Sequence, residues 1–519
     1  MKRLVTICLC VTLAVWAAKA QRRISCTGHG ERMETRGASG RSISECITEW
    51  DANRVYRQPV VLITFQDLDF SMDDPVAYYN RVLNEKGYNE GVGKGCAADY
   101  FREQSGGLFN LQFDIYGPIK VDTKAQDKTV PDNYGEYTME NALEQLRATC
   151  KTDFSIYDWN GDGEVNQILF ICAGYSGTEV RYYVFPNSKL TSEMAPGNLP
   201  ISMLSISCEL WKNGSTYGIG TLLHEFSHCL GLPDLYPINH YDSRFSMVDE
   251  WDLMDGGNMT NWGWCPPNYS ALEKQLLGWK TPTELTESTS VTGMKPVSEG
   301  GETFIIRNSA YPNEFYLLEN RQQTGWDYGI PGKGLLIIHV DYDEKSWGMN
   351  EVNDFMTNDR YSLVSADGKT YTDWNPRQDA GSTDGYTMDG RLRSRYLSGS
   401  AYPYTNTESL VVNRALTNTS EPPAMLFHDN AEGIMLMSKP ITNIQMDENG
   451  YISFDFMMDA TGIEDVKDGQ CTMYDGQWRM YDGQWRMDND GWYTLDGRPL
   501  SGKPTQRGMY VHEGKVVMQ

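Results

Sequence analysis

The first half of the chain contains two kinds of hydrophobic pattern. "PVVLITFQD" (59–67) is the first run that predicts a strand, and "FNLQFDIYGPIKV" (109–121) alternates apolar and polar residues like a strand. "NQILFICAGY" (166–175) is apolar almost throughout, which is typical of a strand buried on both faces. Helical spacing appears in two segments between the first two strands. These patterns predict a mixed α/β part that ends near Lys280.

After Lys280 the helical periods nearly disappear. Runs such as "GETFIIRN", "EFYLLENRQ" and "GKGLLIIHVDY" predict strands, and Asp- and Gly-rich loops separate them. We therefore expect an α/β part at 58–284 and a β-rich part at 285–458 that partly completes it. Residues 459–491 resemble a linker in which "MYDGQWR" occurs twice, and 492–519 predict three short strands with tight turns.

The N-terminal residues have the features of a secretory signal peptide. Lys2 and Arg3 precede an apolar run that ends at Trp16, and "AKA" presents small residues for cleavage after Ala20. We expect residues 1–20 to be removed, and residues 21–57, which are polar and lack a strong period, to form a short propeptide or lead-in. No segment of the mature chain is apolar for long enough to span a bilayer. The protein is thus predicted to be secreted or displayed at the cell surface.

Composition narrows the range of partners. The 519 residues carry a formal charge of −25, and loss of Lys2, Arg3 and Lys19 with the signal peptide makes it −28. Such a charge repels nucleic acid and anionic membranes, so we expect neither as a partner. Acidic side chains can also supply oxygen ligands for calcium, which is abundant outside cells.

The stretch "HEFSH" (224–228) contains the spacing of a zinc site. On a helix predicted from about Gly218 to Leu230, His224 and His228 lie one turn apart and can share a tetrahedral metal. Glu225 can then serve as the general base for the water that attacks a carbonyl. Chance also produces this five-residue pattern, so the residues that follow it matter.

Three features downstream strengthen the prediction of a metal site. Gly231 can adopt the left-handed turn that ends a helix, and Asp234 follows at the spacing where the chain can return to the metal. A histidine at that position defines the usual metzincin pattern; here a carboxylate replaces it, and carboxylate oxygens also bind zinc. Met254 in "WDLMDGG" resembles the methionine turn beneath a metzincin zinc site. We predict Asp234 as the third ligand, with Glu209 as the first alternative.

A second acid-rich stretch, "DWNGDGEVN", resembles the first half of a calcium loop. Oxygen-bearing side chains alternate before a glycine, and later positions could add a backbone carbonyl and a side-chain ligand. Leu169 occupies the position where an EF-hand needs glutamate, so the stretch is not an EF-hand. An Asp/Gly-rich turn held by its own backbone is the alternative. The candidate calcium ligands are Asp158, Asn160, Asp162, Glu164 and Asn166, with Asp153 as a further oxygen donor.

These stretches together resemble the immune inhibitor A family of secreted bacterial metallopeptidases. The likeness is carried, in order, by "DYFREQSGGLF", "GTLLHEFSHCLGLPDLY", "WDLMDGG", "PPNYSALEKQLLGW" and "YLLENRQQTGWDYGIPGKGLLIIHVDY". It implies a metzincin-like α/β (α+β) catalytic domain at 58–284, with zinc held by His224, His228 and Asp234 and with Glu225 as general base. The family's large prodomain has little room here, and Cys26 is either a thiolate cap for zinc or an ordinary cysteine.

The C-terminal stretch resembles sorting signals of the type IX secretion system, through "LDGRPLSGKPTQRGMYV" and "GKVVM". The alternative is a small β-subdomain with no role in export. For the whole chain we expect a zinc-dependent endopeptidase that acts on extracellular proteins or peptides. A non-catalytic surface adhesin that keeps the peptidase fold is the competing hypothesis, and the presence of Glu225 favours the enzyme because a binding module needs no base.

Overall fold

A computed structural model of the chain describes residues 23–25, 49–90, 93–126, 134–176, 187–238, 247–354, 358–369 and 397–458, with short segments between 478 and 518. The predicted signal peptide, Cys26 and most of the predicted linker lie outside the described residues. The chain divides into two units, Met1–Met457 and Met458–Gln519. The first unit therefore contains both the α/β part and the β-rich part.

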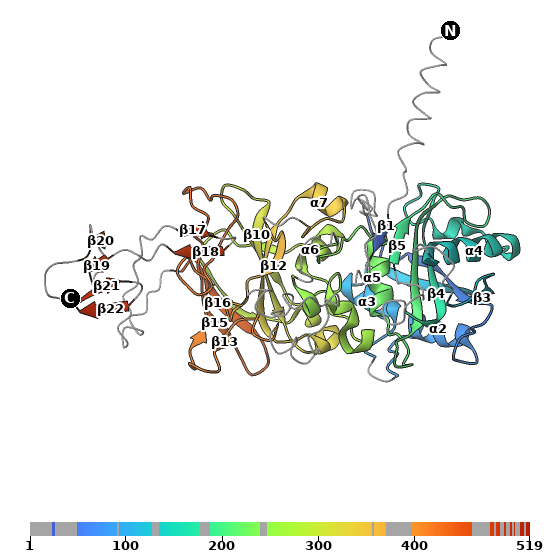
Figure 1. Ribbon diagram of the computed structural model, residues 1–519, viewed down its shortest axis with the longest axis horizontal. Helices are drawn as coiled ribbons and strands as arrows, with labels where there is room; N and C mark the ends of the chain where they lie inside the picture. The colour runs from blue at the N-terminus through green and yellow to red at the C-terminus, as the bar shows by residue number, and fades with distance from the viewer. Residues whose placement is uncertain are drawn as a thin grey trace, which may run out of the picture. The chain divides into compact units, whose positions relative to one another are not determined.

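A six-stranded sheet forms the centre of the α/β part (Figure 1). Four neighbouring strands run parallel, β5 runs antiparallel to them, and the edge strand β1 pairs antiparallel with β5. The predicted strands are confirmed, although the first begins four residues earlier than expected. In spatial order the strands are β1 (Arg23–Ser25), β5 (Asn187–Leu190), β6 (Ile201–Leu210), β4 (Val165–Tyr175), β2 (Val55–Thr64) and β3 (Asn110–Lys120).

Helices cover both faces of this sheet, which explains why its central strands are apolar on both sides. In β2, Val60 and Leu62 belong to the core shared with α2, α3 and α5, whereas Val61 and Ile63 belong to the core shared with α4. Figure 1 shows α4 and α5 on opposite sides of the strands. The helices are α2 (Pro75–Asn84), α3 (Ala97–Gln104), α4 (Tyr134–Thr149), α5 (Gly220–Cys229), α6 (Ala271–Leu276) and α7 (Glu344–Gly348).

The β-rich part contributes to the same core as the α/β part. Strand β10 alternates its side chains, so that Leu317 packs in the core that includes α5, while Leu318 packs in a second core within the β-rich part. In spatial order its larger sheet contains β12 (Tyr361–Leu363), β11 (Gly334–Asp341), β10 (Glu314–Arg321), β9 (Thr303–Arg307) and β7 (Thr283–Glu284). The smaller sheets contain β15 (Ile441–Met446), β16 (Ile452–Phe456) and β8 (Thr289–Met294), and β13 (Tyr404–Thr405) with β14 (Val412–Asn413).

The described residues of the second unit are mostly in short strands. Part of the predicted linker has secondary structure. Strands β17 (Trp478–Tyr481) and β18 (Gln484–Met487), which include residues of the repeated heptapeptide, pair antiparallel. The tail contains four strands where the pattern predicted three, because Pro499 and Leu500 add a two-residue edge strand that is too short to produce a pattern. In spatial order they are β20 (Pro499–Leu500), β19 (Trp492–Thr494), β21 (Met509–His512) and β22 (Lys515–Met518).

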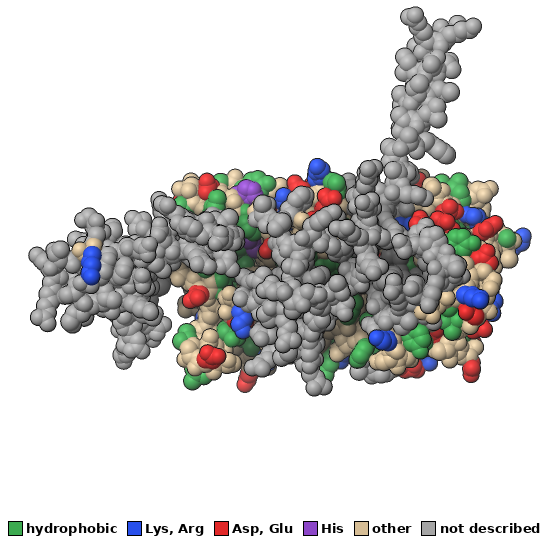
Figure 2. Space-filling model, viewed as in Figure 1, with side chains coloured by type: hydrophobic (Ala, Val, Ile, Leu, Met, Phe, Trp, Pro, Cys, Tyr) green, Lys and Arg blue, Asp and Glu red, His purple; other side chains and the backbone are tan. Residues whose placement is uncertain are grey.

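On the visible face, acidic side chains are interspersed with basic, polar and apolar ones (Figure 2). Within the described residues, no helix is both long enough and apolar enough to cross a membrane.

Candidate metal centre

Helix α5, which carries the two histidines, is buried along its whole length. It starts without a side-chain cap; instead the chain at Gly218 and Gly220 runs directly against backbone from the 256–263 region. A Cβ atom at Gly220 would lie 2.0 Å from the carbonyl oxygen of Asn258. Glycine at this position therefore permits the close approach that places the helix.

The end of α5 turns the chain back toward its own histidines. The helix ends at Cys229, and Gly231 follows with φ of +92°, the left-handed conformation expected for it. The amide of Leu235 then donates to the carbonyl of Met254 at 2.9 Å. This backbone bond ties the loop that contains Asp234 to the methionine-containing turn.

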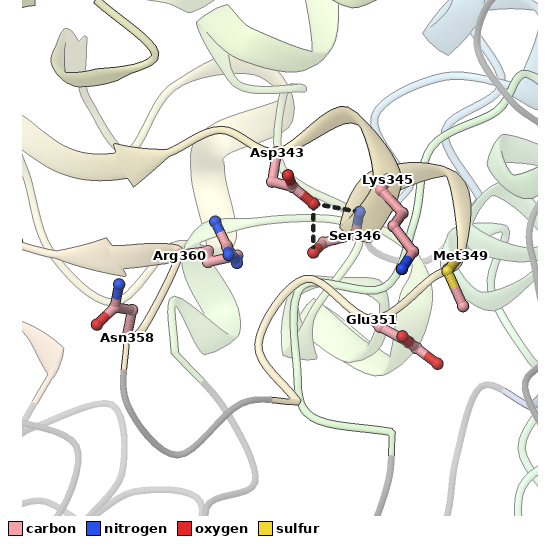
Figure 3. Close-up of a pocket in the computed structure, with 7 residues that line it drawn as sticks. All are labelled: Asp343, Lys345, Ser346, Met349, Glu351, Asn358 and Arg360. Atoms are coloured by element: carbon pink, nitrogen blue, oxygen red, sulfur yellow. Dashed lines mark hydrogen bonds between the residues drawn. The ribbon is translucent and has the colours of Figure 1, made fainter. Parts of the chain in front are cut away.

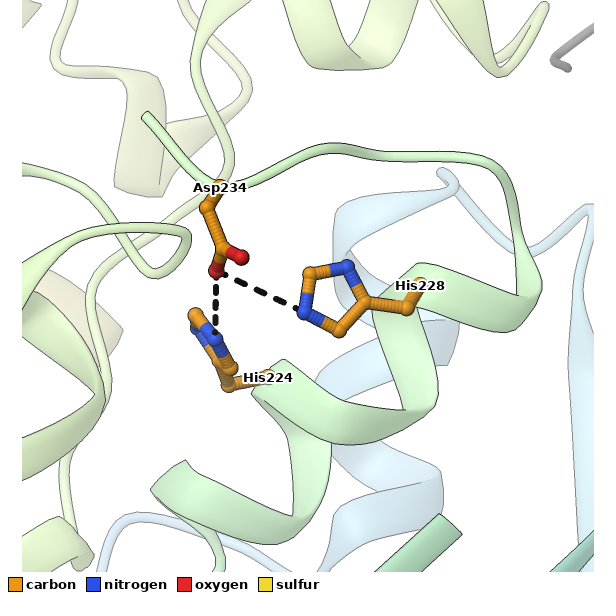
Figure 4. Close-up of side chains that lie close together, drawn as sticks. All are labelled: His224, His228 and Asp234. Carbon is orange, nitrogen blue, oxygen red and sulfur yellow. Dashed lines mark ion pairs between the residues drawn. The ribbon is translucent and has the colours of Figure 1, made fainter. Parts of the chain in front are cut away.

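The three predicted ligands converge, as Figure 4 shows. Oδ1 of Asp234 lies 3.1 Å from Nε2 of His224 and 3.5 Å from Nε2 of His228. The ligand atoms of these three side chains lie close enough together to hold one metal ion, and the described part of the chain contains no other such group of three or more His, Cys, Asp or Glu side chains. The sequence spacing of four and then six residues thus corresponds to one compact cluster.

Backbone carbonyls orient both imidazoles toward the centre of this cluster. Nδ1 of His224 lies 2.8 Å from the carbonyl oxygen of Leu253, and Nδ1 of His228 lies 2.8 Å from that of Leu232. Because a carbonyl can only accept, each Nδ1 donates a proton to it, and the Nε2 atom of each ring faces the cluster, where it can bind a metal. Leu253 immediately precedes Met254, so the methionine turn supports the site through its backbone.

The chemistry of the cluster fits a divalent metal. Within the described residues, Nε2 of His224 and Oδ1 of Asp234 are buried and make no hydrogen bond, although buried polar atoms rarely lack one. Burial alone would raise the pKa of Asp234, but the imidazoles of His228 and His224 lower that pKa below its ordinary value. Two neutral nitrogen ligands and one carboxylate oxygen form a donor set that zinc accepts.

Glu225 follows His224 on α5, and its side chain contacts the main sheet. Oγ of Ser188, on β5, lies 3.0 Å from Oε2 of Glu225 and 2.7 Å from Oγ of Ser205 on β6. Gln167 on β4 donates in turn to the Ser205 hydroxyl. A buried chain of polar groups across three strands therefore holds the candidate base. The sequence analysis did not identify these residues, because isolated serines carry no motif.

The alternative ligand considered for the metal lies elsewhere. Oε1 of Glu209 accepts from the amide and the hydroxyl of Ser71, both at 2.6 Å, and Oε2 accepts from the amide of Gly174 at 2.8 Å. Its carboxylate is thus held by groups outside the cluster. His339, interpreted from the sequence as a core residue, lies buried with Nε2 2.8 Å from Oε1 of Glu314.

The candidate calcium loop forms a turn held by its own backbone. Oδ1 of Asp158 accepts from the amide of Gly161 at 2.7 Å, and Oδ2 accepts from that of Gly163 at 2.9 Å. Asp162 accepts from the amide of Glu164 and from the side chain of Asn160. Such bonds from side chains to nearby backbone amides are expected for an Asp/Gly-rich turn, the alternative to a calcium site.

Two further candidate oxygen donors at this loop also accept hydrogen bonds. Oδ1 of Asn166 accepts from the amide of Trp159 at 2.6 Å, and Asp153 accepts from the amide of Ser155 at 3.0 Å. A calcium site at this loop stays a prediction, since backbone amides and a cation can both be partners of a carboxylate.

A pocket of about 260 Å³ lies in the segment after β11 (Figure 3). Charged side chains of both signs line it, among them Asp343, Lys345, Glu351 and Arg360. The pocket shares no residue with the cluster, so we assign it no part in the chemistry. It does show that the segment around α7 is folded into a defined surface.

Comparison with known proteins relates the chain distantly to the metallopeptidases. It is 22% identical over 268 residues to proteins described as "Pre-pro-metalloprotease PrtV" from two Vibrio cholerae O1 strains, M66-2 and ATCC 39315 / El Tor Inaba N16961. The match covers 44% of this chain and 28% of the length of each relative. No family model matches the chain. The likeness supports a proteolytic function at the level of the class.

Proposed function

We propose that this chain is a zinc-dependent endopeptidase that hydrolyses peptide bonds in extracellular proteins, within a metzincin-like catalytic domain. The observation that carries the proposal is the convergence of two imidazole Nε2 atoms on one carboxylate oxygen, with both Nδ1 atoms committed to backbone carbonyls. Such an arrangement brings three ligand atoms together in a buried site. The distant likeness to a metalloprotease supports the same class of reaction.

His224, His228 and Asp234 would hold the zinc ion, and Glu225 would move the proton. Zinc, when bound, supplies a Lewis acid that polarises the peptide carbonyl and acidifies a water. The carboxylate of Glu225 takes a proton from the attacking water and returns it to the departing amine. Its contact with Ser188 keeps the carboxylate oriented on the β5 side of the site.

Access to the site and the N-terminal lead-in form part of the same proposal. The side chains of His224, Glu225 and Asp234 are 0% exposed, so a protein substrate can reach them only after the site opens. The lead-in predicted at 21–57 overlaps β2, which begins at Val55 and buries Tyr56, so a removable propeptide would have to end before that strand. Strand β1, which pairs with β5, would be removed with that propeptide. N-terminal sequencing of the exported protein should find a start at Gln21, or further along after removal of the lead-in. A start within the apolar run would contradict this.

The proposed activity can be tested with the purified protein. Its zinc content is measured by mass spectrometry, and it is incubated with a mixed peptide library whose cleavage sites are then identified. We expect about one zinc per chain by stoichiometry, cleavage that a zinc chelator abolishes, and recovery when zinc is restored. Zinc without any cleavage would instead support the non-catalytic adhesin. Cleavage that survives complete removal of the metal would contradict both hypotheses.

The proposal includes export through type IX secretion machinery, because residues 492–519 resemble its sorting signals. Deleting residues 492–519 in the producing cell and following the location of the protein tests it. An unchanged distribution would favour the alternative, a small β-subdomain. The acidic composition continues to argue against nucleic acid as a partner.

A further inference from the structure

The loop that carries Asp234 is fastened by a segment of the β-rich part. Asn353 donates from Nδ2 to the carbonyl of Leu235 at 2.6 Å, and the amide of Ile238 donates to Oδ1 of Asp354 at 2.6 Å. These partners lie 118 and 116 residues apart in the chain. The conformation of the loop thus depends on residues far beyond the zinc-binding motif.

One residue of that segment, Asn350, contacts Asp234 itself in two ways. The amide of Asp234 donates to Oδ1 of Asn350 at 2.5 Å, and Nδ2 of Asn350 donates to Oδ2 of Asp234 at 2.8 Å. Asn350 is 1% exposed and Asp234 is 0% exposed, so water does not compete for these bonds. With Oδ2 occupied by the amide, Oδ1 is the oxygen that faces His224 and His228.

The backbone of Asn350 makes a clean substitution available. Its φ of +58° lies in the left-handed region, which asparagine tolerates better than most residues and glycine adopts freely. Glycine at this position would therefore remove the amide group without straining the chain, whereas alanine would remove it and add strain.

We propose that Asn350 is a positioning residue for the metal site, which holds the Asp234 carboxylate with Oδ1 directed toward the two imidazoles. This inference rests on the proposed function, since it assumes that Asp234 binds the metal. Asn350 touches neither the histidines nor Glu225 through any hydrogen bond described above; it acts through Asp234 alone. Residues that orient a metal ligand typically contribute about 10–100-fold to metal affinity.

The test measures zinc affinity by competition with a chromogenic chelator, using the full mature chain. The variants are Asn350→Gly and Asn350→Ala, and the matched control is Asn443→Gly. Asn443 also has a left-handed backbone, with φ of +52°, and also donates to a carboxylate, that of Asp455, but it lies on β15 and is exposed. The thermal midpoint of each metal-free variant is recorded alongside.

We expect both Asn350 variants to bind zinc about 10–100-fold more weakly than the unmodified chain, and the control to bind it equally well. Because glycine and alanine differ in backbone strain, their thermal midpoints should differ while their losses of zinc affinity agree. Zinc affinity that instead follows the thermal midpoints would overturn the positioning role, as would unchanged affinity in Asn350→Gly. If the unmodified chain binds no zinc, the proposed function fails, and this inference fails with it.

Discussion

The two acid-bearing sites suggested by the sequence, the His224–His228–Asp234 cluster and the Asp158–Asn166 loop, differ in what their oxygen atoms do. In the cluster, the buried Oδ1 of Asp234 makes no hydrogen bond with any described residue and lies between two imidazoles. In the loop, both carboxylate oxygens of Asp158 accept from backbone amides, and Asn160 and Asp162 are exposed.

The two sites differ in whether each carboxylate oxygen already has a hydrogen-bond donor. A buried carboxylate oxygen that accepts no hydrogen bond is costly unless positive charge faces it, and Oδ1 of Asp234 faces the two imidazoles, which can supply that charge by protonation or by holding a metal ion. A carboxylate that already caps a turn is satisfied without an ion. Acidic residues in a suggestive order thus have different meanings depending on burial and on local amide donors.

The largest effect should come from removing the base of the cluster. Glu225→Gln keeps the shape of the side chain but cannot take a proton, so we expect peptide hydrolysis to fall by about 10²–10⁴-fold. Zinc content should remain that of the unmodified protein, because the cluster itself is intact. Peptide turnover and metal analysis on the same sample check both statements. Near-full activity in this variant would remove Glu225 from the mechanism.

The next largest effect should show which carboxylate, that of Asp234 or that of Glu209, is the metal ligand. Asp234→Ala should lower zinc affinity by more than the roughly 10–100-fold that loss of a supporting residue costs. Glu209→Gln is the matched control, because that buried carboxylate is held by Ser71 and Gly174. Equilibrium dialysis against zinc compares the two. A fall in affinity in the Glu209 variant alone would exchange their roles.

Glycine substitutions should show that the backbone around the cluster is packed more tightly than the backbone of the acidic loop. Gly220→Ala places a Cβ 2.0 Å from a carbonyl oxygen beside the cluster helix, and such overpacking should cost about 3 kcal/mol in free energy of unfolding. Gly161→Ala in the acidic loop meets no atom within 4 Å and is strained only by its φ of +75°, for about 1 kcal/mol. Urea unfolding of both variants measures the difference, and equal costs would show that the helix can shift.

The smallest expected effect concerns calcium at the acidic loop. If calcium binds there in the folded state, it should raise the thermal midpoint by a small amount, and the rise should disappear in Asp158→Ala/Asp162→Ala. Melts with calcium and with a calcium-selective chelator provide the measurement. Absence of a calcium-dependent shift in the native protein, or the same shift in the double variant, would leave the loop as a self-capped turn.

Much of the cluster could be predicted because its information is local. The spacing of His224 and His228 follows from the helical repeat, and Gly231 takes the left-handed turn expected of it. The apolar run of β4 likewise indicated a strand covered on both faces. The acidic loop was harder to interpret, because the same alternation of oxygens serves a cation site and a capped turn.

Sequence patterns alone predict the elements whose chemistry repeats within a few residues: the helix that carries His224 and His228, its glycine turn and the strands of the main sheet. Tertiary structure decided what supports them. The carbonyl of Leu253 orients His224, Ser188 contacts Glu225, and Asn350 reaches Asp234 from 116 residues away. These contacts leave no periodic trace, because one hydrogen bond between distant segments constrains only one residue on each side. The contact of Asn350 further requires that the α/β part and the β-rich part share a core.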